Sequence, residues 1–228
     1  MLGTPAALLL AGLLGSCGNQ AWTEAQKASL SPVSLRQTGM APGAYHAPDA
    51  TNPPGASGAV PAATGGGAIP ALIGLAIDAG VSKVQQSKFD KAEGHHAAGS
   101  QQHIPGDLSR RLSDKLDRSL KKDPFFKDRL KQGASASIQP TLTSYGYKRV
   151  SETEEGAILM SPVVEAEISV TGNDGKSLLK QKVLSPGGSP APFRDYATHP
   201  AKARAAFDKE LDLVVQQIEA IWSRKLGR

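Results

Sequence analysis

The stretch AILMSPVVEAEISV, residues 157–170, decides the fold of this 228-residue chain. Its second half alternates apolar and polar side chains, and because successive side chains of a strand point to opposite faces, the pattern predicts a half-buried strand. Asn-Asp-Gly at 173–175 favours a tight hairpin turn, so residues 177–184 are expected to return as a second strand. Residues 137–150 are rich in β-forming residues and predict a third strand, for which Pro140 indicates an edge position.

Two amphipathic helices are expected to flank these strands. The first spans 107–120, where leucine recurs at every fourth position, and the second spans 200–224, where large apolar residues recur at spacings of three and four. The second helix is expected to lie across the apolar face of strand 157–170. This order of elements predicts an α+β fold over 104–228, a short antiparallel sheet of three or four strands packed by amphipathic helices. The apolar stripes consist of Leu108, Leu112, Leu116 and Leu120 in the first helix and of Phe207, Leu211, Val214, Ile218, Ile221 and Trp222 in the second.

The chain before this domain has a different composition. Hydrophobic residues make up 39% of the whole chain and aromatic residues 5%, and few large apolar residues fall between positions 18 and 68. Residues 38–68 consist mainly of Gly, Pro, Ala, Ser and Thr without a helical or strand period, so ordering them would bury little apolar surface. We therefore expect a disordered tether over 17–68. A helix is expected over 69–93, directly after three glycines.

The N-terminal residues are typical of an export signal. Residues 6–14 are apolar, too few to span a bilayer core of about 30 Å, and small residues and the only cysteine of the chain follow. The tetrad Leu14-Gly15-Ser16-Cys17 resembles the lipobox of bacterial lipoproteins. This resemblance implies that residues 1–16 are a signal peptide, that the Cys17 thiol receives diacylglycerol, and that the mature protein begins at an acylated Cys17. Because Gly18, and not aspartate, follows the cysteine, the resemblance also implies sorting to the outer membrane.

The whole arrangement also resembles known envelope proteins. A lipobox, a Pro-rich segment and one compact helix-and-sheet domain are together similar to the penicillin-binding-protein activator lipoproteins and to the TolB N-terminal domain. The similarity is one of architecture and involves no diagnostic residue, so it is an analogy of fold. It implies a periplasmic, lipid-anchored domain that binds envelope proteins.

The net charge of +5 arises in one part of the chain. Residues 107–131 hold nine Lys or Arg against five Asp, mostly on the first predicted helix. A basic surface of this kind favours an anionic partner, although a solvated polar face of an amphipathic helix has the same composition. The candidate surface consists of Arg110, Arg111, Lys115, Arg118, Lys121 and Lys122.

No motif in the chain indicates an enzyme. Gly175-Lys176-Ser177 lacks the earlier glycine and the following helix of a phosphate-binding loop. His95, His96 and His103 lie among glycines and serine, without the fixed spacing of a zinc site. Glu165 and Glu167 fall on the polar face of a strand, and no nucleophile elbow is present. We expect no catalytic residues, metal, cofactor or nucleic-acid partner.

The sequence therefore predicts a non-catalytic lipoprotein of the outer membrane that faces the periplasm and binds a protein partner or assembles envelope components. The alternative is direct binding of an anionic envelope polymer, lipopolysaccharide or peptidoglycan, through the basic surface. Salt dependence would distinguish this alternative, because exposed charges are screened over about 8 Å at physiological ionic strength.

Overall fold

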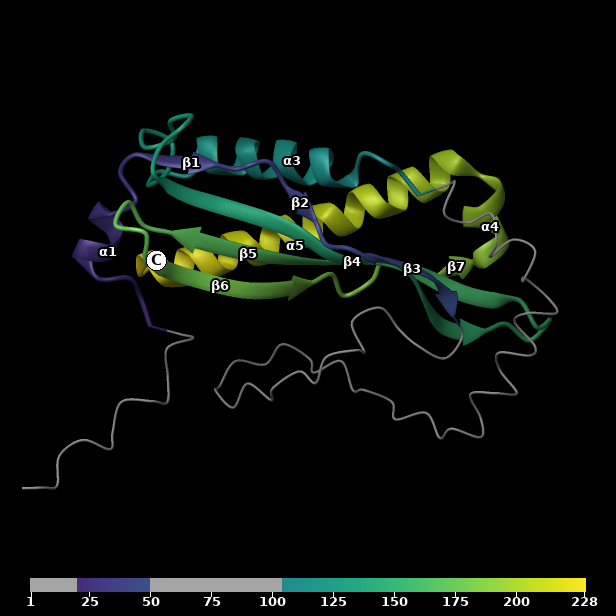
Figure 1. The fold of residues 1–228 in the computed structure, drawn as a ribbon. Helices are drawn as coiled ribbons and strands as arrows, with labels where there is room; N and C mark the ends of the chain where they lie inside the picture. Colours follow the sequence, from purple (N-terminus) through teal and green to yellow (C-terminus); the bar gives the residue numbers. More distant parts are fainter. Residues whose placement is uncertain (1–19, 50–103) are drawn as a thin grey trace, which may run out of the picture.

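The computed structural model describes residues 20–49 and 104–228. In these ranges, a sheet of seven strands carries its main helices on one face (Figure 1). The two long helices and the apolar side of the sheet share one hydrophobic core. The α+β class predicted from the sequence is confirmed.

The three predicted strands form the centre of the sheet. β4 (Ala136–Glu152) pairs antiparallel with β5 (Ile158–Thr171), which pairs antiparallel with β6 (Ser177–Leu184). The predicted hairpin turn joins β5 to β6, and Gly175 adopts a φ of 78° there, a value that glycine reaches without steric cost. The short strand β7 (Ala191–Pro192) pairs with the first residues of β5.

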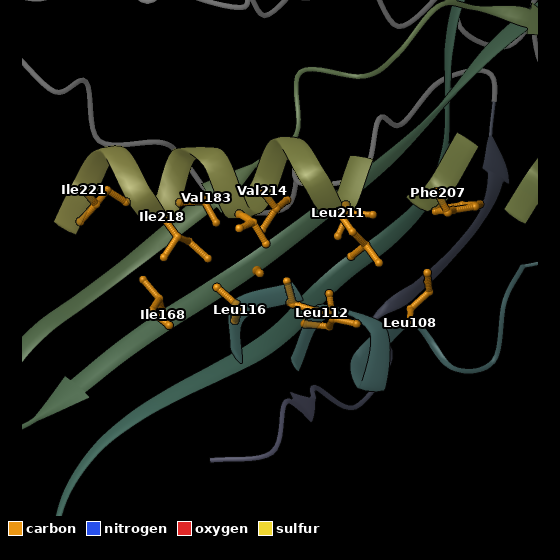
Figure 2. Packing of buried hydrophobic residues seen from close by; sticks show 14 of the residues in the cluster. Leu108, Leu112, Leu116, Ile168, Val183, Phe207, Leu211, Val214, Ile218 and Ile221 are labelled. Carbon is orange, nitrogen blue, oxygen red and sulfur yellow. The ribbon is translucent and has the colours of Figure 1, made fainter. Parts of the chain in front are cut away.

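The two predicted amphipathic helices are α3 (Leu108–Lys122) and α5 (Pro200–Leu226). All four leucines of the α3 stripe are buried, as are the six apolar residues predicted for α5. Figure 2 shows Leu108, Leu112 and Leu116 facing the side chains of α5 across the core. A short helix, α4 (Phe193–Thr198), precedes α5 and adds Phe193 and Tyr196 to the core.

Residues 20–49 are folded, so the expectation of a disordered tether over 17–68 is wrong for this part. They contain α1 (Glu24–Ala28) and three short strands, β1 (Val33–Leu35), β2 (Gly39–Met40) and β3 (Tyr45–Asp49). All three strands pair with β4 in parallel, which makes the sheet mixed where a purely antiparallel sheet was expected. Backbone hydrogen bonds to β4 stabilise this segment, although its composition offers few apolar side chains.

The predicted edge position of β4 is also wrong, because β4 lies between the three parallel strands and β5. Pro140 is nevertheless accommodated. Its position falls between the registers of β1, which ends at Leu35 opposite Ile138, and β2, which begins at Gly39 opposite Thr141. A residue without a backbone N–H therefore occupies an interruption in the parallel pairing.

Other predicted segments lie outside the described residues. They are the signal peptide over 1–16, Cys17, the remainder of the expected tether, the helix over 69–93, and the three histidines His95, His96 and His103. Within the described ranges, no helix is both long enough and apolar enough to cross a membrane.

Candidate functional site

The predicted basic surface lies on α3, and its central cations contact α5. Arg111 pairs with Asp208 at 2.8 Å, and Lys115 pairs with both Asp208 and Asp212, at 3.3 and 2.5 Å. The Lys115 side chain is only 11% exposed. These contacts hold α3 and α5 side by side, so Arg111 and Lys115 serve the packing of the domain and do not form part of a free basic surface.

The other predicted cations of α3 differ in their partners. Arg110 pairs with the carboxylate three residues earlier at 3.0 Å, and Lys121 pairs with the carboxylate four residues earlier at 2.6 Å. Arg118 and Lys122 are exposed and form no ion pair with any residue of 20–49 or 104–228. The six predicted cations thus fall into three groups: two pair with α5, two pair within or next to α3, and two form no ion pair with the described residues. They do not form one site.

The first described residues are fixed by contacts that no sequence motif indicated. The backbone N–H of Trp22 donates to the Lys225 carbonyl at 2.6 Å, and the Lys225 ammonium donates to the Gln20 carbonyl at 2.9 Å. The Trp22 indole is 4% exposed and donates to the carbonyl of Leu178 in β6 at 3.3 Å. Residues 20–22 are therefore attached to both the last turn of α5 and the edge of the sheet. We call these contacts the N-terminal clamp.

The sequence did contain a signal for part of this segment. Thr23 and Gln26 form a reciprocal capping box at the start of α1, with the spacing that marks a helix N-terminus. The bonds of the clamp itself join residues between 156 and 205 positions apart. Because all three are accepted by backbone carbonyls, no pattern of side chains in the sequence could have predicted them.

The clamp lies at one end of the domain, which we call the anchor end. This end consists of residues 20–31, the end of α3 with the segment that follows it (121–133), the β5–β6 turn at 172–176, and the last turns of α5 (Figure 1). Asn173 donates its backbone N–H to Ser29 at 2.9 Å, and Arg228 pairs with Asp123 at 2.8 Å. These contacts join the four segments into one surface.

Cations exceed anions at the anchor end. Three of its carboxylates pair with neighbouring cations, namely Glu24 with Lys27, Asp123 with Arg228, and Asp174 with Lys176. Several exposed cations at this end form no ion pair with any described residue. Among the acidic side chains of this end, Asp128 is the one that has no ion pair or hydrogen bond within the described ranges. These unpaired cations are Lys122, Lys127, Lys131 and Arg224.

A buried carboxylate lies at the opposite side of α5 from the ion pairs. Glu210 has no exposed surface and faces the loop after β6, where a Cβ on Gly188 would come within 2.7 Å of its Oε1. Burial raises the pKa of Glu210, while the Ser185 hydroxyl and the backbone of Gly188 and Gly187 oppose this rise. The carboxyl group thus lies against the glycine loop, and neither of its buried oxygens has a hydrogen-bond partner among the described residues.

Replacement of Glu210 by glutamine is expected to change the pH dependence of stability. Because the folded protein raises the pKa of this carboxyl above its usual 4.5, the folded state binds the proton more tightly. Its contribution to stability is present below the unfolded pKa and is lost as pH rises through the folded pKa. Glu210→Gln should therefore gain stability relative to the parent chain as pH rises, measured by denaturant unfolding at acidic and neutral pH.

The control for this prediction is Glu154→Gln, at an exposed position in the turn between β4 and β5. This variant should follow the parent chain at each pH. A Glu210→Gln variant that loses stability relative to the parent as pH rises would show that the loop amides favour the ionised carboxylate.

The residues considered for chemistry lie apart. Glu165 accepts hydrogen bonds from Thr143 and Lys182, and Glu167 pairs with Lys180 at 3.4 Å, on the polar side of the sheet. Gly175-Lys176-Ser177 is the β5–β6 turn, followed by a strand. Over 20–49 and 104–228, no three His, Cys, Asp or Glu side chains are grouped so that they could hold a metal ion.

Comparisons with known proteins identify no family for the chain. No family model matches the sequence, and no curated protein matches it significantly. Among solved structures, the chain is similar to a Xanthomonas campestris protein of the family DUF330, with 10% sequence identity, a TM-score of 0.42 and 91% of each chain covered. At this TM-score the similarity supports no conclusion about function.

Proposed function

We propose that this protein is a lipoprotein of the outer membrane, attached through Cys17, with its folded domain in the periplasm. The observation that carries the proposal is the tetrad Leu14-Gly15-Ser16-Cys17 directly after a short apolar run. An acylated cysteine with several long chains is a lasting anchor, because each buried methylene contributes about 0.8 kcal/mol. The clamp holds Gln20, the first described residue, which lies three positions after this cysteine in the sequence.

We further propose that the domain acts by binding a protein partner of the envelope. The ion pairs between α3 and α5 and the clamp at residues 20–22 connect these segments and restrict their relative motion. A rigid domain at a membrane presents the same surface to each partner, which limits the entropy lost on binding. The six α3 cations give less support to an anionic polymer partner, because Arg111 and Lys115 are engaged with α5.

The attachment is tested by Cys17→Ser in the full-length chain. Acylation needs the thiol, so the variant should move from the membrane pellet to the soluble fraction and lose incorporation of labelled palmitate. Ser16→Ala, which keeps a small residue before the cysteine, is the matched control and should stay in the membrane. A Cys17→Ser protein that remains in the pellet after a salt wash would contradict the proposal.

The binding role is tested by crosslinking in intact cells, followed by purification of the lipidated chain from solubilised outer membrane. We expect one protein to be recovered reproducibly with the parent chain and to be lost with the Cys17→Ser variant. Recovery of no specific protein under these conditions would contradict the binding role and leave the attachment unaffected.

A further inference from the structure

The clamp determines how far the domain can lie from its anchor. Gln20 lies three positions after Cys17 and is held by Lys225. An extended chain covers at most about 3.6 Å per residue, so these three positions span about 10 Å. If Cys17 carries the lipid, the anchor end of the domain lies at the membrane surface.

The surface brought to the membrane in this way has a matching charge. Lys122, Lys127, Lys131 and Arg224 are exposed there and form no ion pair with any residue of the described ranges, whereas the pairs of Glu24, Asp123 and Asp174 neutralise those carboxylates locally. A gap of about 10 Å is close to the Debye length of about 8 Å at physiological ionic strength. Cations at that distance are still attracted by the negative surface potential of a bilayer that contains anionic lipids.

We propose that the anchor end docks on anionic phospholipid headgroups, so that the domain stands on the membrane in one fixed orientation. This inference rests on the proposed attachment through Cys17. Lys122, Lys127, Lys131 and Arg224 contact the phosphates, and α5 leads away from the bilayer. The partner-binding surface is then the part of the domain remote from residues 20–22.

The test is lysine footprinting of the mature, lipidated chain in vesicles. The chain is reconstituted in phosphatidylcholine alone or with a minority of phosphatidylglycerol, and a water-soluble acylating reagent modifies the accessible lysines. Lys127 and Lys131 are read by mass spectrometry, with the exposed Lys209 as the internal control. Lys209 lies sixteen residues before Lys225 in α5, about 24 Å away at 1.5 Å per residue.

We expect phosphatidylglycerol to lower the modification of Lys127 and Lys131 several-fold and to leave that of Lys209 unchanged. Lys131→Glu combined with Arg224→Glu should abolish the protection of Lys127 while the chain still floats with the vesicles. Lys209→Glu combined with Arg194→Glu makes the same change of charge at exposed positions elsewhere, and it should preserve the protection.

A second variant distinguishes the effect of the short connection to Cys17 from the effect of the surface charge. A flexible Gly-Ser insertion of about twenty residues between Gly18 and Asn19 lets the domain average about 25 Å from its anchor. The insertion should weaken the protection of Lys127 and Lys131, and the protection that remains should be more sensitive to salt. Full protection of these lysines with the insertion would mean that the charge alone holds the domain on the bilayer, and it would overturn the role of the short connection.

The outcomes distinguish the two proposals. A mature chain that does not float with vesicles overturns the attachment itself. A chain that floats, but whose Lys127 and Lys131 react equally in both vesicle types or whose Lys209 is protected as strongly, overturns the docked orientation and leaves the attachment standing. Protection that appears only after lipopolysaccharide is added would assign this surface to that polymer and overturn the phospholipid proposal.

Discussion

Replacement of Trp22 by alanine is expected to lower the free energy of unfolding by about 3–5 kcal/mol, the usual cost of removing a buried aromatic side chain. The indole is buried in the core, and its N–H donates to the Leu178 carbonyl. The substitution therefore removes apolar contacts and also leaves an edge carbonyl of β6 without that donor. Denaturant unfolding followed by circular dichroism measures the change.

The control for Trp22→Ala is Glu24→Ala two residues later, whose side chain is 89% exposed. Its exposed pair with Lys27 is expected to contribute less than about 1 kcal/mol. Hydrogen exchange provides a second readout, because the amide of Trp22 donates to Lys225 and should exchange faster in Trp22→Ala. A Trp22→Ala variant as stable as the parent chain would show that residues 20–22 are not attached to the domain.

Leu116→Ala is expected to lower the free energy of unfolding by about 2–5 kcal/mol. Leu116 has no exposed surface and lies in the middle of the α3 stripe, between α5 and the sheet (Figure 2). Alanine would leave a cavity between α3, α5 and the sheet, and the ion pairs between α3 and α5 limit how far these helices can close it. The magnitude depends on how far these elements relax, and denaturant unfolding of the full chain measures it.

The matched control is Asp114→Ala, at an exposed position of the same helix. Alanine favours a helix slightly more than aspartate does, so this variant should stay within about 0.5 kcal/mol of the parent chain. Equal stabilities of Leu116→Ala and the parent chain would contradict the packing of α3 on the core.

The sequence predicted those elements in which apolar side chains recur at a regular spacing or in which a turn motif is present. The leucine stripe of α3, the alternation in β5 and the Asn-Asp-Gly turn each arise from local geometry, and the structure confirms all three. The stripe of α5 also predicted which face of that helix is buried. In each case, burial on one side of an element left a repeating pattern in the residues themselves.

The sequence did not predict the three parallel strands before α3. β1 to β3 are only two to five residues long, too short to show a usable alternation of apolar and polar residues. They are held by backbone pairing with β4, about a hundred positions later in the chain, and by a few core side chains such as Val33. A composition that resembles a linker is compatible with a strand when a preformed neighbour supplies the hydrogen bonds.

The basic surface was predicted correctly in composition but not in its partners. The acidic residues that neutralise Arg111 and Lys115 lie on α5, almost a hundred residues away, and only the packing of the two helices brings them together. The cations that remain unpaired within the described residues include Lys127 and Lys131, which follow the helix and were not among the six predicted residues.

The mass of the N-terminal peptide of the membrane-extracted protein tests the lipoprotein proposal most directly. The proposal predicts a peptide that begins at Cys17 and carries a diacylglycerol thioether together with an amide-linked acyl chain. A peptide with a free Cys17 thiol, or a mature protein that begins at another residue, would contradict both the attachment and the orientation derived from it.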